Sequence, residues 1–431
     1  MKDSGVPPNW KARRLKFAAI VNPVKSEVAH LPIDTQVSFV PMDNIGEYGG
    51  IRLDVEKSIE DVYTGYTYFK DGDVVIAKIT PCFENGKCAI ATGLKNGIGF
   101  GTIELHVVRA DRKHSMPEFL FYYSISHKFN KMGEAEMYGA GGQKRVPDSY
   151  VRNERLYLPP LDEQRAIAAF LDHKTAQIDA LIDKKRRMIE LLKEKRTALI
   201  SHAVTKGLNP DARMKDSGAK WMGMIPAHWE LKKLKFLSKS IKTGKTPASE
   251  SAEYYSDEID WYGPGDFSDD ATVLTESKRR VSQLAIIKRE APLFKANSVL
   301  LVSIGATLGK VGLIRSQASS NQQINAITPN DDTDPVFLMH FLHVVRKQVW
   351  SLAMITTLPI LNQEKTGIIE VITPPHAEQI AIGEYIRVEA AKIDRLISST
   401  QHAIQKLQEY RTAVISAAVT GRIDVRNNGA A

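Results

Sequence analysis

The sequence predicts two α/β (α+β) domains linked by two long antiparallel helices of coiled-coil type, arranged as an internal pseudo-twofold repeat. Three observations lead to this prediction. Each half of the chain opens with the same string, Met-Lys-Asp-Ser-Gly, at residues 1–5 and 214–218. Each half also closes alike, because residues 163–205 and 378–420 are identical at 20 of 43 positions. The roughly 140 residues between these shared ends match only weakly, so one duplicated frame carries two divergent inserts.

The repeat divides the chain into five segments. The first domain takes residues 1–160 and the second takes residues 207–373. The helices that follow them take residues 161–206 and 374–421, and a short tail takes residues 422–431. A chain of 431 residues is long enough for such domains to bury cores of their own.

Composition narrows the class of protein. The formal net charge of +8 favours a polyanionic partner. No apolar run approaches the ~18 residues that a membrane span requires, and the N-terminus is polar and basic. We therefore expect a cytoplasmic protein with no membrane partner. The two cysteines, Cys82 and Cys88, are too few for a disulfide framework or a four-ligand zinc site, although one bridge between them stays open.

Long amphipathic helices are predicted for the two repeated closing segments. Their apolar residues recur at intervals of three and four, with charged residues between them, which is typical of coiled coils. Pro159-Pro160 separates the first helix from the strand-like sequence before it. About 45 helical residues at ~1.5 Å each would form a rod about 65 Å long. Two interpretations stay open: core helices of two packed domains, or spacers that hold the inserts a fixed distance apart.

Mixed α/β structure is predicted for both inserts. Apolar, β-branched runs at residues 72–79 and 296–304 indicate strands. Each run is followed by a turn that contains glycine and lysine, at residues 85–87 or 308–310, and then by another apolar run. Residues 117–129 and 335–350 are predicted to be helical.

No complete catalytic motif is present in the sequence. Residues 305–311 resemble a phosphate-binding loop, but the required spacing would need glycine at Ile304 and a hydroxyl at Val311. Cys82 beside Glu84 resembles the nucleophile pair of cytosine methyltransferases, in which the two elements are well separated and follow a glycine-rich loop. We therefore predict that Cys82 is a small buried side chain. The histidines are scattered without ligand spacing, so we expect no metal site and no catalytic residue.

Several strings resemble type I restriction-modification specificity subunits, and the resemblance runs from end to end. These strings are Lys215-Asp216-Ser217-Gly218 with Trp221-Met222-Gly223, Pro159-Pro160-Leu161 with Glu163-Gln164, residues 411–421, residues 77–87, Gly141-Gly142-Gln143-Lys144-Arg145-Val146, Asn321-Gln322-Gln323 and Leu361-Asn362-Gln363-Glu364. One departure is the first opening signature, in which the Trp-Leu-Gly-x-Ile-Pro part of the pattern is lost between Gly5 and Pro7.

The resemblance implies that residues 1–160 and 207–373 are target recognition domains, each reading one half of a split, asymmetric site in double-stranded DNA. It implies that the helices set the gap and dock two modification subunits, which bring S-adenosylmethionine and methylate adenine. It also implies that restriction subunits, with ATP and Mg, join to cut unmethylated DNA as a defence against foreign DNA. This chain would be non-catalytic and bind no cofactor itself. Helix residues expected at the partner contacts are Ile178, Leu181, Leu192, Ile393, Leu396 and Leu407.

Candidate DNA-contacting residues are polar or basic side chains near the glycine turns. In the first insert they are Lys78, Asn85, Lys87, Gln143, Lys144 and Arg145. In the second insert they are Ser303, Thr307, Lys310, Asn321 and Gln322. Gln143 is the strongest of these candidates, because Gly141-Gly142 permit a tight backbone turn and glutamine can form two hydrogen bonds with adenine. For each residue, a solvated loop position or a turn-forming hydrogen bond is an equally good interpretation.

Another class of function also stays open. The chain would then be a non-catalytic coiled-coil scaffold whose inserts bind proteins. Partner binding that is insensitive to salt, without DNA affinity, would indicate this class, because phosphate contacts weaken steeply with salt. An enzyme with an unrecognised site is the least favoured interpretation.

Overall fold

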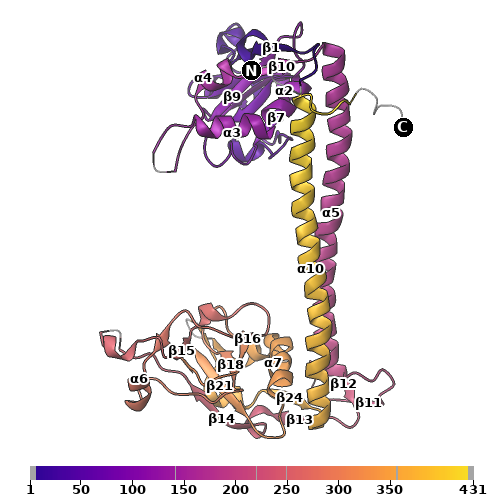
Figure 1. Cartoon of the computed structure of the whole chain (residues 1–431). Coiled ribbons are helices and arrows are strands. Elements are labelled where there is room, and N and C mark those ends of the chain that lie inside the picture. Colours follow the sequence, from indigo (N-terminus) through magenta and orange to yellow (C-terminus); the bar gives the residue numbers. More distant parts are fainter. Residues whose placement is uncertain (1–5, 141, 220, 249, 356–357, 426–431) are drawn as a thin grey trace. The chain divides into compact units, whose positions relative to one another are not determined.

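The computed structural model of the chain describes residues 6–425 except 141, 220, 249, 356 and 357. The first copy of the opening string, residues 1–5, and Gly141 lie outside the described residues. The chain forms two compact units (Figure 1). Unit 1 contains the residues up to Arg187 together with those from Gln401 onward, and unit 2 contains Met188–Thr400.

Unit 1 contains two four-stranded sheets and a separate strand pair. The sheets have the orders β2-β9-β6-β7 and β4-β3-β8-β5, while β1 pairs with β10. Only β3 and β8 run parallel among these described pairs. The strands are β1 (Lys11–Arg14), β2 (Ala19–Val21), β3 (Gln36–Val40), β4 (Glu56–Ser58), β5 (Thr67–Lys70), β6 (Val74–Ala77), β7 (Cys88–Ile90), β8 (Ile98–Gly101), β9 (Leu105–Ala110) and β10 (Arg155–Leu158).

Unit 1 also contains four short α-helices among the described residues. They are α1 (Ile59–Val62), α2 (Pro117–Ser124), α3 (His127–Ala135) and α4 (Asp148–Asn153). Helix α2 is buried along its length and packs against β6, β7 and β9, which explains its aromatic-rich sequence. The helix predicted for residues 117–129 is two helices, because the Ser126 side chain accepts a hydrogen bond from the Phe129 N–H and starts α3.

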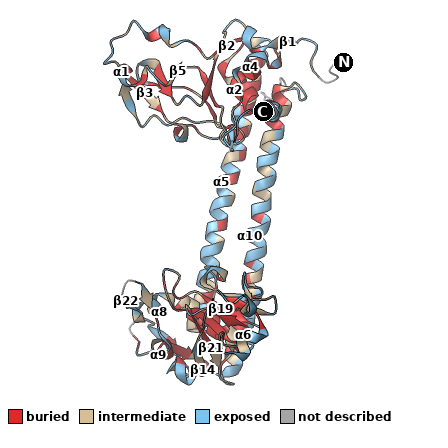
Figure 2. Cartoon of the chain, turned by 90° about the vertical axis from the view of Figure 1, so that its left-hand side faces the viewer, coloured by how far each residue is buried: buried red, intermediate tan, exposed pale blue. Residues whose placement is uncertain are grey.

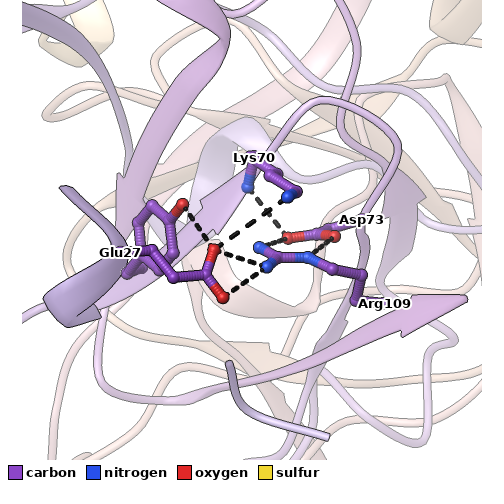
Figure 3. A network of polar contacts seen from close by, with 5 residues as sticks. Glu27, Lys70, Asp73 and Arg109 are labelled. Atoms are coloured by element: carbon purple, nitrogen blue, oxygen red, sulfur yellow. Dashed lines mark hydrogen bonds and ion pairs between the residues drawn. The ribbon is translucent and has the colours of Figure 1, made fainter. Parts of the chain in front are cut away.

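A polar network joins the two sheets of unit 1 (Figure 3). Arg109 on β9 donates two 2.7 Å hydrogen bonds to Asp73 and further bonds of 2.6 and 2.8 Å to Glu27. The Lys70 N–H donates to Asp73, and the Tyr68 hydroxyl donates to Glu27, both from β5. Burial raises the pKa of Glu27, but the hydrogen bonds from Arg109 and Tyr68 and the charges of Arg109 and Lys70 together outweigh it and leave the pKa below its ordinary value.

Unit 2 contains a five-stranded sheet, a three-stranded sheet and three strand pairs. The larger sheets have the orders β14-β21-β18-β19-β16 and β17-β15-β20. The strands are β11 (Met214–Asp216), β12 (Met224–Pro226), β13 (Glu230–Lys233), β14 (Ser238–Thr243), β15 (Ile259–Tyr262), β16 (Thr272–Leu274), β17 (Arg280–Val281), β18 (Val299–Val302), β19 (Val311–Ile314), β20 (Ser319–Ser320), β21 (Ile324–Pro329), β22 (Met354–Ile355), β23 (Pro359–Ile360) and β24 (Glu370–Thr373). The short helices are α6 (Gln283–Ile287), α7 (Pro335–Val344), α8 (Arg346–Leu352) and α9 (Gln363–Gly367).

The two units repeat one arrangement at their centres. In unit 1, β6 lies between β9 and β7 and α2 packs on it. In unit 2, β18 lies between β21 and β19 and α7 packs on it. Both central strands are fully buried, as expected for continuous apolar runs. The predicted α/β class of both inserts is confirmed.

The two cysteines do not form a bridge. Both thiols are free, and Cys88 is buried in β7. Cys82 is half-buried rather than buried, because it lies in the turn between β6 and β7. The predicted burial of Cys82 was wrong for this reason.

The repeated closing segments form the long helices α5 (Leu161–Lys206) and α10 (His376–Val419), as predicted. Each helix passes through both units. About half of their residues are exposed, with buried residues at intervals, as Figure 2 shows. This pattern is that of an amphipathic helix packed along one side.

The helices run antiparallel within each unit (Figure 1). In unit 1, Asp179 of α5 pairs with Arg411 of α10 at 2.9 Å. In unit 2, Arg196 of α5 pairs with Asp394 of α10 at 3.0 Å. The aspartates are equivalent positions of the repeat, and so are the arginines. One ion pair therefore occurs twice, each time with one partner from each copy.

The opening and closing signatures meet in the same way in both units. The indole N–H of Trp10 donates to Glu163 at 3.0 Å, and that of Trp229 donates to Glu378 at 3.1 Å. The next residue of each closing signature, Gln164 or Gln379, is fully buried. These contacts tie the opening signature of each copy of the repeat to the N-terminal turn of the long helix that closes the same copy.

Each buried glutamine holds three backbone groups. The Gln164 amide donates to the carbonyls of His114 and Pro159, and its oxygen accepts from the Met116 N–H. The equivalent amide in unit 2 makes the same three bonds, each within 3.1 Å, to Asp332, Pro374 and Asp334. We call the duplicated tryptophan, glutamate and glutamine contacts, together with the two long helices, the shared frame.

Glycine ends both long helices. Gly207 follows α5 with φ of +80°, and Gly421 follows α10 with φ of +72°. A Cβ at Gly421 would lie 2.4 Å from Pro7, and one at Gly207 would lie 3.1 Å from the Trp229 ring. Each glycine both permits the left-handed turn and leaves room for the opening signature of its unit.

Candidate nucleic-acid interface

In unit 1, the end of β6 brings several candidate residues together. The Val146 N–H donates to the Lys78 carbonyl at 2.8 Å, and the Thr80 N–H donates to the Lys144 carbonyl at 3.0 Å. Lys78 therefore lies beside the loop that carries Gln143, Lys144 and Arg145. Lys78 and residues 143–145 are far apart in the sequence, and neither this separation nor their residue types predicted that they lie together.

Only some of the side chains in this group are free of partners within the protein. Arg145 forms hydrogen bonds of 2.7 and 2.9 Å to Glu104, and this pairing lowers the pKa of Glu104. Gln143 and Lys144 are exposed, and neither side chain forms a hydrogen bond or ion pair among the described residues. These two side chains are the ones that a base or a phosphate could reach.

The glycine–lysine turn of unit 1 is held by the protein itself. Lys87 is 17% exposed, donates to the Met42 carbonyl at 3.1 Å and lies 3.8 Å from Asp43. The Asn85 amide is exposed but donates to Glu47 at 3.1 Å. Both donors already have partners, which argues against a primary role in reading bases.

A hollow of about 710 Å³ lies beside this turn. Its lining includes four carboxylates, those of Glu47, Glu84, Asp179 and Asp183. Carboxylates in this number disfavour the approach of a phosphate backbone. The lining also includes Arg186 and Arg411, but its carboxylates outnumber these arginines, which makes the hollow an unfavourable phosphate-binding surface.

In unit 2, Ser303 occupies the place that Lys78 has in unit 1. The Leu361 N–H donates to the Ser303 carbonyl at 2.8 Å, as Val146 does to Lys78. The Ser303 hydroxyl is buried and donates to the Gln323 carbonyl at 3.0 Å. A buried hydroxyl that already has a partner argues against direct contact between Ser303 and DNA.

The remaining candidates of unit 2 differ in exposure. Lys310 is 14% exposed and lies 3.0 Å from Asp269, whose pKa it lowers through this bond. Thr307 is half-buried, and Asn321 is half-buried with its amide donating to Gln323 at 3.1 Å. Gln322 is exposed and accepts a hydrogen bond from Thr246. Gln322 is thus the most accessible of the group.

One element of unit 2 was missed from the sequence. The β22–β23 hairpin precedes α9 and forms a bridge between Ile360 and Ile304, as Arg145 does with Ile79 in unit 1. It therefore occupies the place of the Gln143 loop. A usable signal was its position just before a short helix and the following double proline, which both halves share.

The helix candidates fall into three pairs of equivalent positions. Ile178 and Ile393 are both 5% exposed and pack inside their units. Leu181 and Leu396 are exposed, at 43% and 48%. Leu192 and Leu407 are half-buried. Of these pairs, the exposed leucines are best placed for a partner.

The described residues contain neither a metal-binding cluster nor a membrane-spanning helix. No group of three or more histidine, cysteine, aspartate or glutamate side chains is arranged to hold a metal ion. None of the described helices combines the length and the apolar character needed to span a membrane.

The comparison with known families decides the assignment. A family model described as "Type I restriction modification DNA specificity domain" matches residues 36–191 and 226–409. The chain belongs to this family. The two matched stretches cover both divergent inserts and most of both long helices, so the family assignment and the internal repeat agree. The resemblance predicted from the sequence is confirmed.

Relatives include type I specificity subunits from bacteria and archaea. The EcoAI specificity subunit of Escherichia coli is 39% identical over 195 residues, 43% of this chain and 33% of that protein. The EcoEI specificity subunit of Escherichia coli is 37% identical over 43% of this chain and 32% of that protein. The chain thus matches about a third of the length of these two relatives. The MjaVIII specificity subunit of Methanocaldococcus jannaschii is 25% identical over 76% of this chain and 75% of that protein.

Solved structures share the fold. A structure described as the basis of complex assembly and conformational transition of the type I R-M system has a TM-score of 0.73 and 20% identity. It covers 97% of this chain and 99% of that chain. The HsdS subunit from Thermoanaerobacter tengcongensis has a TM-score of 0.62 and 18% identity, over 98% of this chain and 99% of that chain. The predicted fold class is confirmed.

Proposed function

We propose that this chain is the DNA-recognition subunit of a type I restriction-modification complex and reads a bipartite, asymmetric site in double-stranded DNA. One observation carries the proposal: a shared frame with identical contacts in both units holds two domains whose accessible surfaces differ. An asymmetric site needs two different readers, and a fixed gap needs a common frame. The family assignment and the net charge of +8 support a DNA partner.

The first reader would use Gln143 and Lys144, and the second would use Gln322 and the β22–β23 hairpin. Exposure supports this choice, because an exposed side chain can exchange water for a base edge or a phosphate, although Gln322 also accepts a hydrogen bond from Thr246. Lys78, Arg145 and Lys310 would add positive potential close to the DNA rather than base-specific contacts. Asn85, Thr307 and Asn321 remain secondary candidates.

This chain would determine which DNA sequence is recognised, and its partner subunits would catalyse the reactions. Two modification subunits would bring S-adenosylmethionine and methylate adenine, and restriction subunits would use ATP and Mg to cut unmethylated DNA. This chain would bind none of these cofactors, catalyse no step itself and work in the cytoplasm. The equal exposure of Leu181 and Leu396 at equivalent positions supports the docking of two copies of one modification subunit.

Methylation mapping tests the proposal. The chain would be expressed with its modification subunit in a host without DNA methylation, and methylated adenines would be mapped across the genome. We expect a split motif with two unequal halves and a fixed gap. A Gln143→Ala variant should relax one position of one half only, while Gln177→Ala on the exposed side of α5 should leave the motif unchanged.

The opposite result points to a protein-binding scaffold. If no motif emerges, a titration of DNA binding against salt separates the remaining possibilities. Affinity that falls steeply as salt rises keeps a DNA partner. Absence of DNA affinity at low salt, with both subunits present, refutes the proposed function.

A further inference from the structure

Arg411 and Arg196 occupy equivalent positions of the repeat and are mostly buried, with side chains 12% and 19% exposed. Each pairs with an aspartate of the other long helix, as described for the shared frame. Each also contacts a loop of the divergent domain in its own unit. The Arg411 guanidinium lies 5.1 Å from the centre of the Tyr48 ring, and Arg196 lies 3.5 Å from Asp270. A shared arginine thus meets an unshared loop in both units.

In unit 1, the contact continues to the glycine–lysine turn. The Tyr48 N–H donates to the Gly86 carbonyl at 2.9 Å, and a Cβ on Gly86 would lie 2.9 Å from the Tyr48 ring. The neighbouring Glu47 accepts from the Asn85 amide. The Tyr48 ring therefore contacts both the turn and Arg411 of the long helix.

In unit 2, different residues make the same connection. Asp269 precedes Asp270, the loop residue that contacts Arg196. It lies 3.0 Å from Lys310 and 3.9 Å from Arg346. Arg346 in turn donates to the Leu308 carbonyl at 3.1 Å. The loop that meets the shared arginine therefore also holds the turn at residues 308–310.

We propose that Arg411 and Arg196 are positioning residues, each of which orients the glycine–lysine turn of its own unit and thereby sets the selectivity for one half of the DNA site. This inference rests on the proposed function. Identical arginines cannot themselves read two different half-sites. Arg411 is also engaged by Asp179 and lines the carboxylate-rich hollow, which disfavours contact with phosphate. The arginine acts on DNA through the turn that it holds and the reading loop beside that turn. In unit 1, the segment before the turn donates from the Thr80 N–H to the Lys144 carbonyl, and in unit 2 it donates from the Gly305 N–H to the Pro359 carbonyl of β23, both at 3.0 Å.

Selectivity should change in one half-site at a time. The whole chain, with its modification subunit, would methylate a library of sites in which single bases of either half are changed. We expect Arg411→Ala to raise methylation of sites altered in one half by roughly fivefold or more, the effect of losing alignment of a base contact. Arg196→Ala should do the same for the other half.

Matched variants separate positioning from stability. Arg387→Ala removes an exposed arginine of α10 whose ion pair is with Glu384 and should leave both halves selective. Tyr48→Leu should reproduce Arg411→Ala, while Tyr48→Phe, which keeps the ring, should behave as the wild type. Tyr48 is 37% exposed, so its loss tests the connection without breaking a helix ion pair.

Two outcomes are decisive against the inference. If Arg411→Ala relaxes both halves equally, or lowers total methylation without changing selectivity, the arginines only stabilise the frame. If wild-type selectivity is absent, the proposed function has failed and the positioning role fails with it. A split motif in the wild type with unchanged selectivity in the Arg411 and Tyr48 variants overturns the positioning role alone.

Discussion

Replacing Gln164 with leucine should destabilise unit 1, because the fully buried glutamine side chain satisfies three backbone groups and leucine can satisfy none. A hydrogen bond contributes about 1 kcal/mol net, and a buried group left without a partner costs about 1–3 kcal/mol. Three such groups give a loss of roughly 3 kcal/mol or more. Gln379→Leu should produce the same loss in unit 2, since that amide makes the same three bonds.

Hydrogen exchange followed by mass spectrometry measures this loss unit by unit. Exchange in β6 and β9 reports the opening of unit 1, and exchange in β18 and β21 reports that of unit 2. A loss of about 3 kcal/mol accelerates exchange through global opening by roughly a hundredfold. We expect this acceleration in β6 and β9 for Gln164→Leu, and in β18 and β21 for Gln379→Leu.

Exposed glutamines on the same helices provide the controls. Gln177 on α5 and Gln405 on α10 are exposed, and each bonds only to a side chain one turn away. Their replacement by leucine should change stability by less than about 0.5 kcal/mol. If Gln164→Leu were no more destabilising than Gln177→Leu, water would be satisfying the three backbone groups and the buried glutamine would not be what fixes the frame.

Three further expectations concern the core, the acid stability and the spacing. Asp73→Asn should destabilise unit 1 by about 3 kcal/mol in chemical denaturation, because it leaves a largely buried arginine short of a charge, whereas Asp54→Asn at an exposed pair should cost less than about 1 kcal/mol. Burial lowers the pKa of His340 to about 4, so the unfolded chain takes up a proton near pH 6.5 before the folded unit does. Stability of unit 2 is then lost as pH falls from 7 towards 4, by about 2 kcal/mol at pH 5, and His340→Leu should flatten that dependence in pH-resolved melting. Inserting four helical residues after Lys193, with a matching insertion after Gln408, adds ~6 Å and should lengthen the unread gap in the methylation map by roughly one to two base pairs while both half-sites stay unchanged.

The parts of the fold that could be predicted are those whose signal lies in consecutive residues or occurs in both copies of the repeat. The long helices follow from apolar spacing within each segment, and the repeat confirmed the pattern independently. The central strands β6 and β18 follow from buried β-branched runs. Such signals lie in a few consecutive residues, so no tertiary information is needed to find them.

The candidate site was harder to predict because its decisive contacts are distant in the sequence. Lys87 and Lys310 follow glycine and were predicted to contact DNA, yet Asp43 and Asp269 pair with them. Ser303 looks like a polar loop residue but ends a buried strand. The neighbouring sequence gives no indication of these ion pairs or of this burial. Gln143 and Lys144 could be proposed from the sequence because glycine, amide and basic side chains are adjacent there.

The crossed ion pairs explain why parts of the frame stay identical while the inserts diverge. In unit 1, the aspartate comes from the first copy and the arginine from the second, and in unit 2 the origins are reversed. A change in either copy therefore breaks a pair in one unit unless the other copy changes with it. Loops that contact only their own unit carry no such constraint, so Tyr48 and Asp270 can differ while both meet the same arginine. The frame can thus keep one geometry while each domain changes what it reads.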